Sequence, residues 1–433
     1  MTDPERPRGH GEDGRTERSG HEADGRESAK PGRNHGVYTY LGKPKSKMTR
    51  RSTSRRQFMG ALGAGALAGL AGCADPFGGD TTDAGEEISV PSLAQFRGSG
   101  ALAEGRPAPG GTSIDELPDL SGTLNIYMGG GEGGIYERFI EMLAEIYPDF
   151  SGFTDDAPSA SQAQSIVEAV QSGGSQADVF WSIDAASLGY VAENDAYEPL
   201  ADEALEPVPA HFQGADGAWV GVAGRARSVP YNTDAIDASE IPEKVAQFPG
   251  TDAFQGTMGW APTYGAFKSF VTAMRLQEGA ETTRQWLESM RQAGTERYPN
   301  EYVVTRAVAD GELTAGFANH YYAMRVKNQR PDAPLDLAFT SGDAGALVNV
   351  AGILQIEGTE KDALITDFVR HLLSAEAQEF FATVSYAYPM IPEVEPVGGL
   401  PTVDELNPPD IDLAALADLE PTLELMSEAG VPG

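Results

Sequence analysis

A long, mostly apolar segment in the middle of the chain reads Gly217-Ala218-Trp219-Val220-Gly221-Val222-Ala223-Gly224-Arg225-Ala226-Arg227-Ser228-Val229-Pro230-Tyr231-Asn232-Thr233. We interpret it as a long strand that crosses between two lobes. A second apolar crossing follows at Ala346-Leu347-Val348-Asn349-Val350-Ala351-Gly352. Two such crossings are what a hinged, two-lobed protein requires.

On both sides of the first crossing, strands alternate with helices. Residues 124–128 read as a strand, Gly129 to Gly134 as a glycine-rich turn, and residues 135–146 as a helix that buries Ile135, Phe139, Leu143 and Ile146. The same order recurs at residues 177–181, before a helix near Asp184, and at residues 313–318, before a helix from His320. This alternation predicts parallel α/β sheets whose ligands bind beyond the carboxyl ends of the strands.

The pattern also predicts boundaries for the globular part, which ends with amphipathic helices at about residues 361–373 and 375–384. We expect the first lobe at residues 121–226 and the second lobe at 227–341. Residues 342–395 would form the hinge return and the C-terminal helices, and residues 396–433 a C-terminal extension.

Charge divides the chain into two parts. Up to Arg56 it carries 14 Lys and Arg against 8 Asp and Glu, whereas the remainder carries 17 basic against 57 acidic residues. Such an acidic excess repels itself, and it is typical of proteins that work in multimolar salt, where the screening length falls to about 3 Å. We therefore expect an extreme halophile as the host.

The N-terminal region reads as an export signal. Residues 1–47 have little apolar content and are predicted to be disordered, with Met48 as an alternative start of translation. Twin arginines, Arg55 and Arg56, precede a short apolar run that ends in Leu70-Ala71-Gly72-Cys73. This pattern predicts a Tat-type lipoprotein signal at residues 48–72, with lipidation of Cys73, the only cysteine, as the membrane anchor. Residues 73–120 are expected to be a flexible, Gly/Pro/Asp-rich tether.

Two consecutive tyrosines stand at a strand-to-helix turn in Gly316-Phe317-Ala318-Asn319-His320-Tyr321-Tyr322. A phenolate is a hard anionic oxygen donor that suits ferric iron. Paired tyrosines can equally be packing residues with one hydrated hydroxyl, so this segment alone leaves both interpretations open.

Seven blocks, taken together and in order, resemble the periplasmic ferric-iron-binding proteins, the substrate-binding components of iron ABC importers. The blocks are Ala177-Asp178-Val179-Phe180-Trp181, residues 219–233, Gly259-Trp260-Ala261-Pro262-Thr263, Ala307-Val308-Ala309-Asp310-Gly311-Glu312, Asn319-His320-Tyr321-Tyr322, residues 342–352 and Leu373-Ser374-Ala375-Glu376-Ala377-Gln378. The resemblance implies a class II periplasmic-binding-protein fold of the α/β class, with two lobes joined by a two-strand hinge and a cleft between them that closes on Fe³⁺.

The resemblance also implies a ligand set. Tyr321 and Tyr322 match the two phenolate ligands of the family. Many relatives place a histidine where this chain has Gly131, while a tyrosine-rich subgroup uses the next position, here Glu132. Many relatives also place a glutamate where this chain has Ile183. We expect Glu132 and Tyr264 to complete the protein ligands, although Glu132 could instead interact with a helix dipole and Tyr264 could merely line the cleft.

An anion is expected to share the metal, because phenolates and a carboxylate rarely fill six sites around Fe³⁺. The family resemblance suggests that Arg225 or Arg227 pairs with carbonate or phosphate, and alternation places both on one face of the strand. Salt bridges in an acidic protein are the equal alternative for these arginines. Asn300 is a further candidate donor, and Asn319 could donate or cap a helix.

The sequence contains no Gly-x-Ser-x-Gly elbow and no His-Glu-x-x-His motif, so a secreted enzyme is a remote alternative. A stronger one is a binding protein of the same fold for thiamine, a phosphonate or a polyamine. We expect a monomer that binds no nucleic acid, is lipid-anchored outside the cell membrane, and has an ABC permease and ATPase as partners.

Overall fold

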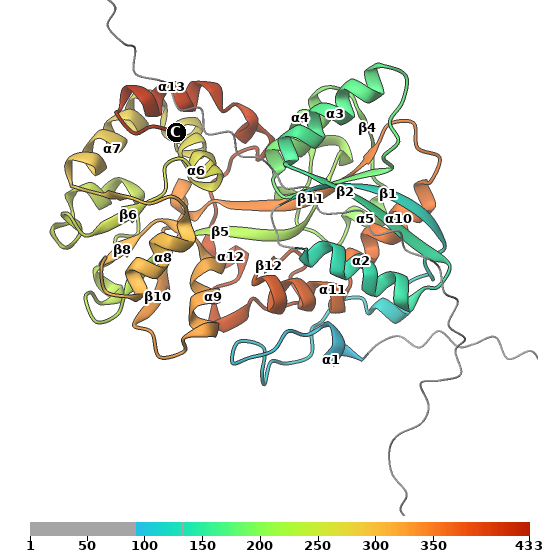
Figure 1. Cartoon of the computed structure of the whole chain (residues 1–433), viewed down its shortest axis with the longest axis horizontal. Coiled ribbons are helices and arrows are strands. Elements are labelled where there is room, and N and C mark those ends of the chain that lie inside the picture. Colours follow the sequence, from blue (N-terminus) through green and yellow to red (C-terminus); the bar gives the residue numbers. More distant parts are fainter. Residues whose placement is uncertain (1–91, 131–133) are drawn as a thin grey trace, which may run out of the picture. The chain divides into compact units, whose positions relative to one another are not determined.

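A computed structural model describes residues 92–130 and 134–433. Two lobes share one twelve-stranded sheet with the principal order β2-β1-β3-β11-β5-β8-β6-β7. The long strands β5 (Val220–Asn232) and β11 (Val348–Ile356) run through the middle of this order (Figure 1).

The first lobe is built on parallel strands. β1 pairs in parallel with β2 and β3, and β11 joins β3 in the antiparallel sense. The elements of this lobe, in chain order, are β1 (Gly122–Gly129), α2 (Ile135–Ile146), β2 (Phe150–Ala157), α3 (Ser159–Gln171), β3 (Val179–Ser182), α4 (Ala185–Glu193), β4 (Tyr197–Glu198) and α5 (Asp202–Leu205).

Helix α2 has the predicted bounds because its apolar residues recur every three or four positions. Tyr136, Phe139 and Leu143 are buried, and the Tyr136 ring stacks on Trp181 of β3 at 4.4 Å between centroids. All four residues of β3 are buried, as expected for a parallel strand covered on both faces.

The second lobe repeats this architecture. β6 pairs in parallel with β7 and β8, while β8, β9 and β10 each pair antiparallel with β5. Its elements are β6 (Met258–Trp260), α6 (Gly265–Glu278), α7 (Ala280–Gln292), β7 (Glu296–Arg297), α8 (Glu301–Ala309), β8 (Ala315–Gly316), β9 (Ala318–Asn319), α9 (His320–Gln329) and β10 (Leu335–Ala338).

Strand β5 passes from one lobe to the other at a defined point. Up to Ala226 it pairs with β11, at Arg227 and Ser228 it pairs with β9, and from Val229 to Asn232 it pairs with β10. The two predicted crossings are therefore adjacent strands, and the candidate arginines lie at the position where β5 changes partner.

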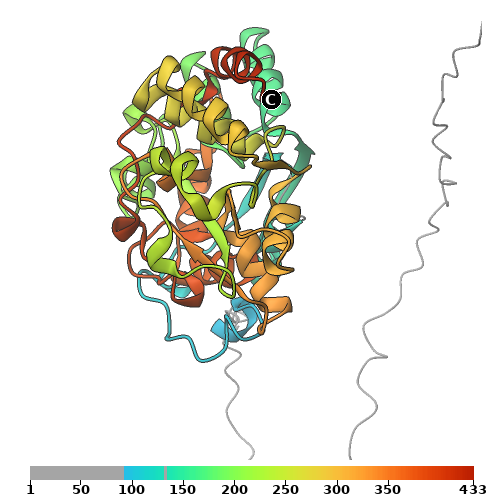
Figure 2. The same cartoon turned by 90° about the vertical axis from the view of Figure 1, so that its left-hand side faces the viewer.

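The chain then returns to the first lobe and ends beside the second. The return comprises α10 (Asp362–Leu372), α11 (Ala375–Phe380), a π-helix (Phe381–Ser385), β12 (Tyr388–Pro389), α12 (Val403–Leu406) and α13 (Glu420–Glu428). Viewed from the side of the second lobe, α13 lies next to α6 and α7 (Figure 2).

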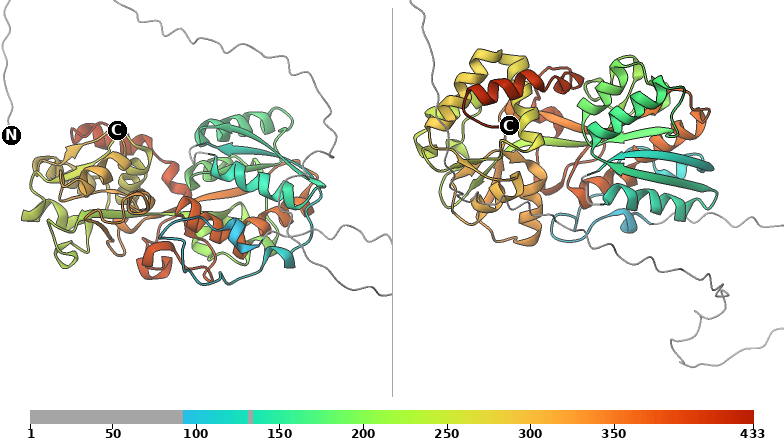
Figure 3. Two further views of the ribbon diagram at one scale, coloured as in Figure 1. Left: turned by 60° about the horizontal axis from the view of Figure 1, so that its bottom comes forward. Right: turned by 45° about the horizontal axis from the view of Figure 1, so that its top comes forward.

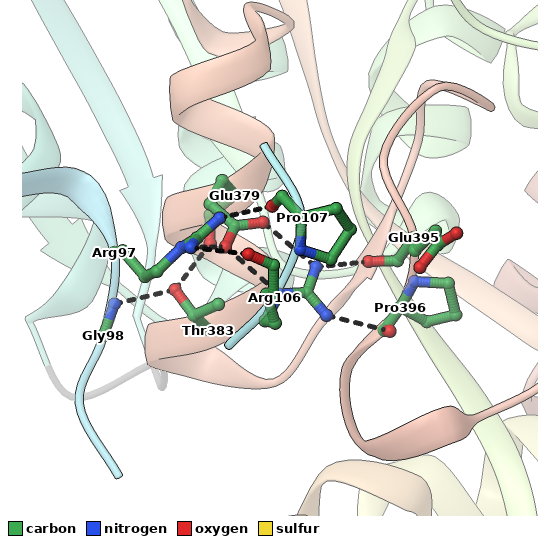
Figure 4. A network of polar contacts seen from close by, with 8 residues as sticks. All are labelled: Arg97, Gly98, Arg106, Pro107, Glu379, Thr383, Glu395 and Pro396. Carbon is green, nitrogen blue, oxygen red and sulfur yellow. Dashed lines mark hydrogen bonds and ion pairs between the residues drawn. The ribbon is translucent and has the colours of Figure 1, made fainter. Parts of the chain in front are cut away.

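Part of the expected tether is instead packed against the body. Phe96, at the end of α1 (Leu93–Phe96), and Ile114 are fully buried. Arg97 and Arg106 both bind the carboxylate of Glu379 in α11, at 2.6 Å and 3.0 Å (Figure 4). Residues 92–120 are therefore not a flexible tether, because buried apolar side chains and a shared carboxylate fix them. The proposed signal segment and Cys73 lie outside the described residues.

No helix in residues 92–130 or 134–433 is long and apolar enough to cross a membrane.

Candidate functional site

A cavity of about 500 Å³ lies where β5 passes between the lobes. Helices α3 and α4 line it from the first lobe, and α6 and α9 from the second. β5 contributes Arg225 and Arg227, so both candidate arginines face the same cavity. This volume is within the range of small-ligand sites in proteins.

The tyrosine pair occupies the first turn of α9. Pairing of Asn319 with Arg227 of β5 fixes the end of β9, and the helix begins at the next residue. Tyr321 and Tyr322 are only 7% and 8% exposed, and their rings lie 4.3 Å apart between centroids. The strand-to-helix turn therefore holds two phenols side by side in a largely dry environment.

A third phenol joins them from the start of α6. The hydroxyl oxygens of Tyr264 and Tyr322 are 2.5 Å apart, and Tyr264 and Tyr321 both line the cavity. The sequence places Tyr264 more than fifty residues before the pair, and the structure brings all three phenols together.

Burial raises the pKa of Tyr322 far above that of a free tyrosine, and the neighbouring Tyr321 and Tyr264 hydroxyls raise it further. The Tyr322 phenol is therefore neutral in the described structure at ordinary pH. A multivalent cation among them would reverse this preference, because its charge stabilises phenolate.

Two further tyrosines, which the sequence did not single out, complete an aromatic cluster. Tyr302, in the first turn of α8, packs against Tyr322 at 6.1 Å between ring centroids. Tyr386 ends the π-helix with a left-handed backbone (φ 61°, ψ 26°) and packs on the same cluster. Non-glycine residues adopt this conformation at some energetic cost, and π-helical turns are frequent at functional sites.

The cluster also has a cation beside it. The Arg325 guanidinium lies 5.3 Å from the centroid of the Tyr321 ring and 5.9 Å from that of Tyr322. Burial raises the pKa of Tyr386, whereas the charge of Arg325 lowers it. Arg325 lies one helical turn after Tyr321, a spacing that the sequence could have revealed.

His320 is fully buried and does not line the cavity. Its Nε2 lies 2.7 Å from the carbonyl oxygen of Tyr386, and its Nδ1 accepts a hydrogen bond from the backbone N–H of Ala226 at 3.2 Å. Burial lowers the pKa of His320 to about 4, so it is neutral at pH 7. His320 therefore connects α9, β5 and the π-helix rather than facing the cavity.

Arg227 is engaged in a buried ion pair. Its guanidinium donates to Glu301 of α8 and, at 3.2 Å, to the side-chain oxygen of Asn319. It also lies 5.2 Å from the centroid of the Phe270 ring. Arg227 and Glu301 are 2% and 0% exposed, so the salt-bridge alternative describes Arg227, although Arg227 and Arg225 both line the cavity.

The candidate asparagines take different positions. The Asn300 side chain accepts a hydrogen bond from the backbone N–H of Val303 and caps α8, and it is not among the residues that line the cavity. Asn319 makes no side-chain cap on α9 and lines the cavity instead. We expected Asn300 as a donor at the site and Asn319 as a donor or a helix cap. In the structure Asn300 is the helix cap and Asn319 lines the cavity.

Glu132 lies outside the described residues. Asp184, near the position where many relatives carry a glutamate, lines the cavity and caps α4 by accepting from the backbone N–H of Ser187 at 2.8 Å. Within residues 92–130 and 134–433 no group of three or more His, Cys, Asp or Glu could hold a metal ion. The predicted ligands in that part of the chain, Tyr264, Tyr321 and Tyr322, are phenols.

Residues 175–412 match the model of a protein family described as bacterial extracellular solute-binding protein. The chain belongs to this family. Because the family consists of solute-binding proteins, this member is a binding protein and not an enzyme. The match ends before residues 413–433, which form the last part of the expected C-terminal extension.

Curated proteins similar to this chain are named as iron-binding or iron-uptake proteins. The major ferric iron-binding protein of Neisseria meningitidis serogroup B is 26% identical over 309 residues, which cover 69% of this chain and 91% of that protein. Iron uptake protein A2 of Synechocystis is 28% identical over 288 residues, which cover 62% of this chain and 82% of that protein.

Among solved structures, iron-bound HitA from Pseudomonas aeruginosa superposes with a TM-score of 0.62 and 26% identity, covering 71% of this chain and 99% of HitA. The predicted two-lobed periplasmic-binding fold is thereby confirmed, as is the resemblance to ferric-iron-binding proteins.

Proposed function

We propose that this solute-binding protein captures ferric iron in the interlobe cleft and delivers it to an ABC importer. The observation that carries the proposal is the convergence of the Tyr264, Tyr321 and Tyr322 phenols beside one cavity. Oxygen donors of this kind suit a hard trivalent cation. The names of the ferric iron-binding protein of Neisseria and of iron-bound HitA point to the same cargo.

The chemistry of capture follows from the raised pKa of Tyr322. Without cargo Tyr322 keeps its proton, and each phenol that coordinates Fe³⁺ must release one. Binding therefore liberates protons into solution, and acid opposes it. Tyr302 and Tyr386 pack against Tyr321 and Tyr322.

The remaining coordination would come from a carboxylate and an anion. Glu132, which precedes α2 in the sequence, is our candidate carboxylate. We place the anion, carbonate or phosphate, between Arg225 and the start of α6, where Gly265 and Ala266 line the cavity next to Tyr264. Backbone N–H groups at a helix start and a guanidinium both favour negative charge. Arg227 would act indirectly, because Glu301 already neutralises its charge.

The proposed partners follow from this function, and the proposed location follows from the N-terminal signal. An ABC permease and its ATPase would receive the iron from the closed protein. Export by the Tat route and lipidation of Cys73 would hold a monomer at the outer face of the cell membrane.

Titration of the purified protein with ferric citrate tests the proposal. A visible phenolate-to-iron charge-transfer band should appear at one equivalent and vanish in the Tyr321→Phe/Tyr322→Phe double variant. Tyr197→Phe in β4 is the matched control, since this tyrosine does not line the cavity. Absence of the band from the native protein, or its persistence in the double variant, would refute ferric capture. Saturable binding of an organic anion without colour would favour the alternative of an organic-solute carrier.

A further inference from the structure

The last 21 residues, 413–433, connect the two lobes along one side of the cavity, and we refer to them as the strap. Its 3₁₀ turn η10 (Ala414–Ala417) packs against α4 of the first lobe. Its helix α13 packs against α6 and α7 of the second lobe. In the right-hand view of Figure 3, the red segment before α13 lies between the helices of the two lobes.

The contact with the first lobe is close and made by small residues. A Cβ added to Gly189 of α4 would lie 2.5 Å from the Cβ of Ala414 and 2.8 Å from its Cα. Leu413 and Leu416, on either side of this contact, are 2% and 3% exposed. The strap and α4 therefore approach as closely as a glycine permits.

The contact with the second lobe is both polar and apolar. Arg275 of α6 donates to the Thr422 hydroxyl at 3.0 Å and to the Asp418 carbonyl and carboxylate at 2.8 Å each. Met426 and Val431 are fully buried. These hydrogen bonds and the apolar packing together hold the strap to the second lobe.

Between its two attachments the strap faces the binding cavity. Leu416, Ala417 and Leu419 line the cavity, as do Arg225 and Tyr321. Any hinge motion that separates α4 from α6 must therefore break the contact between Gly189 and Ala414 or detach α13.

We propose that the strap is a wall of the binding site and a latch between the lobes. While η10 contacts α4, the strap restricts separation of the lobes, and cargo enters and leaves when η10 separates from α4. Only the identity of the cargo rests on the ferric-iron function proposed above.

Gly189→Ala tests the latch. Alanine favours a helix over glycine by about 1 kcal/mol, so α4 should form, while the added methyl group displaces Ala414. The matched control is Gly250→Ala, where an added Cβ meets nothing within 4 Å. Arg275→Met is a second variant that loosens the other attachment while keeping an apolar stem.

Two readouts need no iron. In the iron-free Gly189→Ala protein, amides 413–419 should exchange hydrogen roughly tenfold faster, and the radius of gyration from small-angle scattering should increase. In the loaded protein, release of ferric ion into excess chelator should be about tenfold faster, because weakened contacts act mainly on dissociation.

Exchange and radius equal to those of Gly250→Ala would overturn the latch, as would faster exchange with an unchanged release rate. If the native protein takes up no ferric ion, the ferric function fails, yet the iron-free readouts still decide the latch.

Discussion

Substitution of the buried Glu301 should destabilise the protein strongly. One carboxylate oxygen of Glu301 accepts from Arg227, and the other accepts from the backbone N–H of Asn319 at 2.8 Å. Glu301→Gln keeps the size and one acceptor oxygen but removes the charge. The Arg227 cation is only 2% exposed. In the variant it therefore faces a neutral amide and cannot be hydrated instead.

Breaking a buried ion pair by removing one partner costs about 3–5 kcal/mol. Since the amide retains part of the hydrogen bonding, we expect the free energy of unfolding to fall by about 3 kcal/mol. Chemical denaturation, with the native and variant proteins in the same salt, measures this difference.

Two comparisons make the result specific. Glu281→Gln in α7 removes a carboxylate from an exposed pair with Arg284 and should change nothing measurable, because exposed pairs contribute little. The double variant Arg227→Met/Glu301→Met should be more stable than Glu301→Gln, since no charge is left buried alone. A loss below about 1 kcal/mol in Glu301→Gln would refute the reasoning.

Three further predictions concern pH and the packing of the N-terminal segment. Burial lowers the pKa of His371 from 6.5 to about 4, so neutral His371 contributes to the stability of the fold above pH 6.5, and this contribution is lost as the pH falls through 4. His371→Gln should therefore flatten the dependence of the melting temperature on pH in this range. An unchanged slope would contradict the prediction. Acidification should release bound ferric ion as the phenolates regain protons; the visible band should fade with pH, and a pH-independent band would argue against phenolate ligands. Glu379→Ala should free the segment around Arg97 for trypsin, so that cleavage after Arg97 becomes several-fold faster than in the native protein, whereas Arg106 is no trypsin site because Pro107 follows it. Equal rates of cleavage after Arg97 would mean that the shared carboxylate does not fix this segment.

Local patterns were sufficient to predict the architecture. A few consecutive residues determine each of these elements, and the spacing of their apolar side chains is visible in the sequence. The elements are the two crossing strands, helix α2 and the turn at Asn319. Tyr321 and Tyr322 stand out because such a turn places side chains at the carboxyl end of a strand.

Residues that meet only through the fold could not be predicted in the same way. Tyr386 joins the cluster from a π-helix 64 positions after Tyr322, and no local signal marks it. Nothing adjacent to Glu301 indicates that it neutralises Arg227. Composition also misled us over residues 92–120, where two apolar anchors, Phe96 and Ile114, outweigh the many glycines and prolines.

Anomalous diffraction at the iron absorption edge, from crystals grown with ferric citrate, tests the central claim most directly. The account predicts one strong peak between the lobes, within coordination distance of the hydroxyl oxygens of Tyr321 and Tyr322 and close to that of Tyr264. A peak elsewhere in the molecule, or none in a crystal of the closed protein, would contradict the assignment of these phenols as the iron ligands.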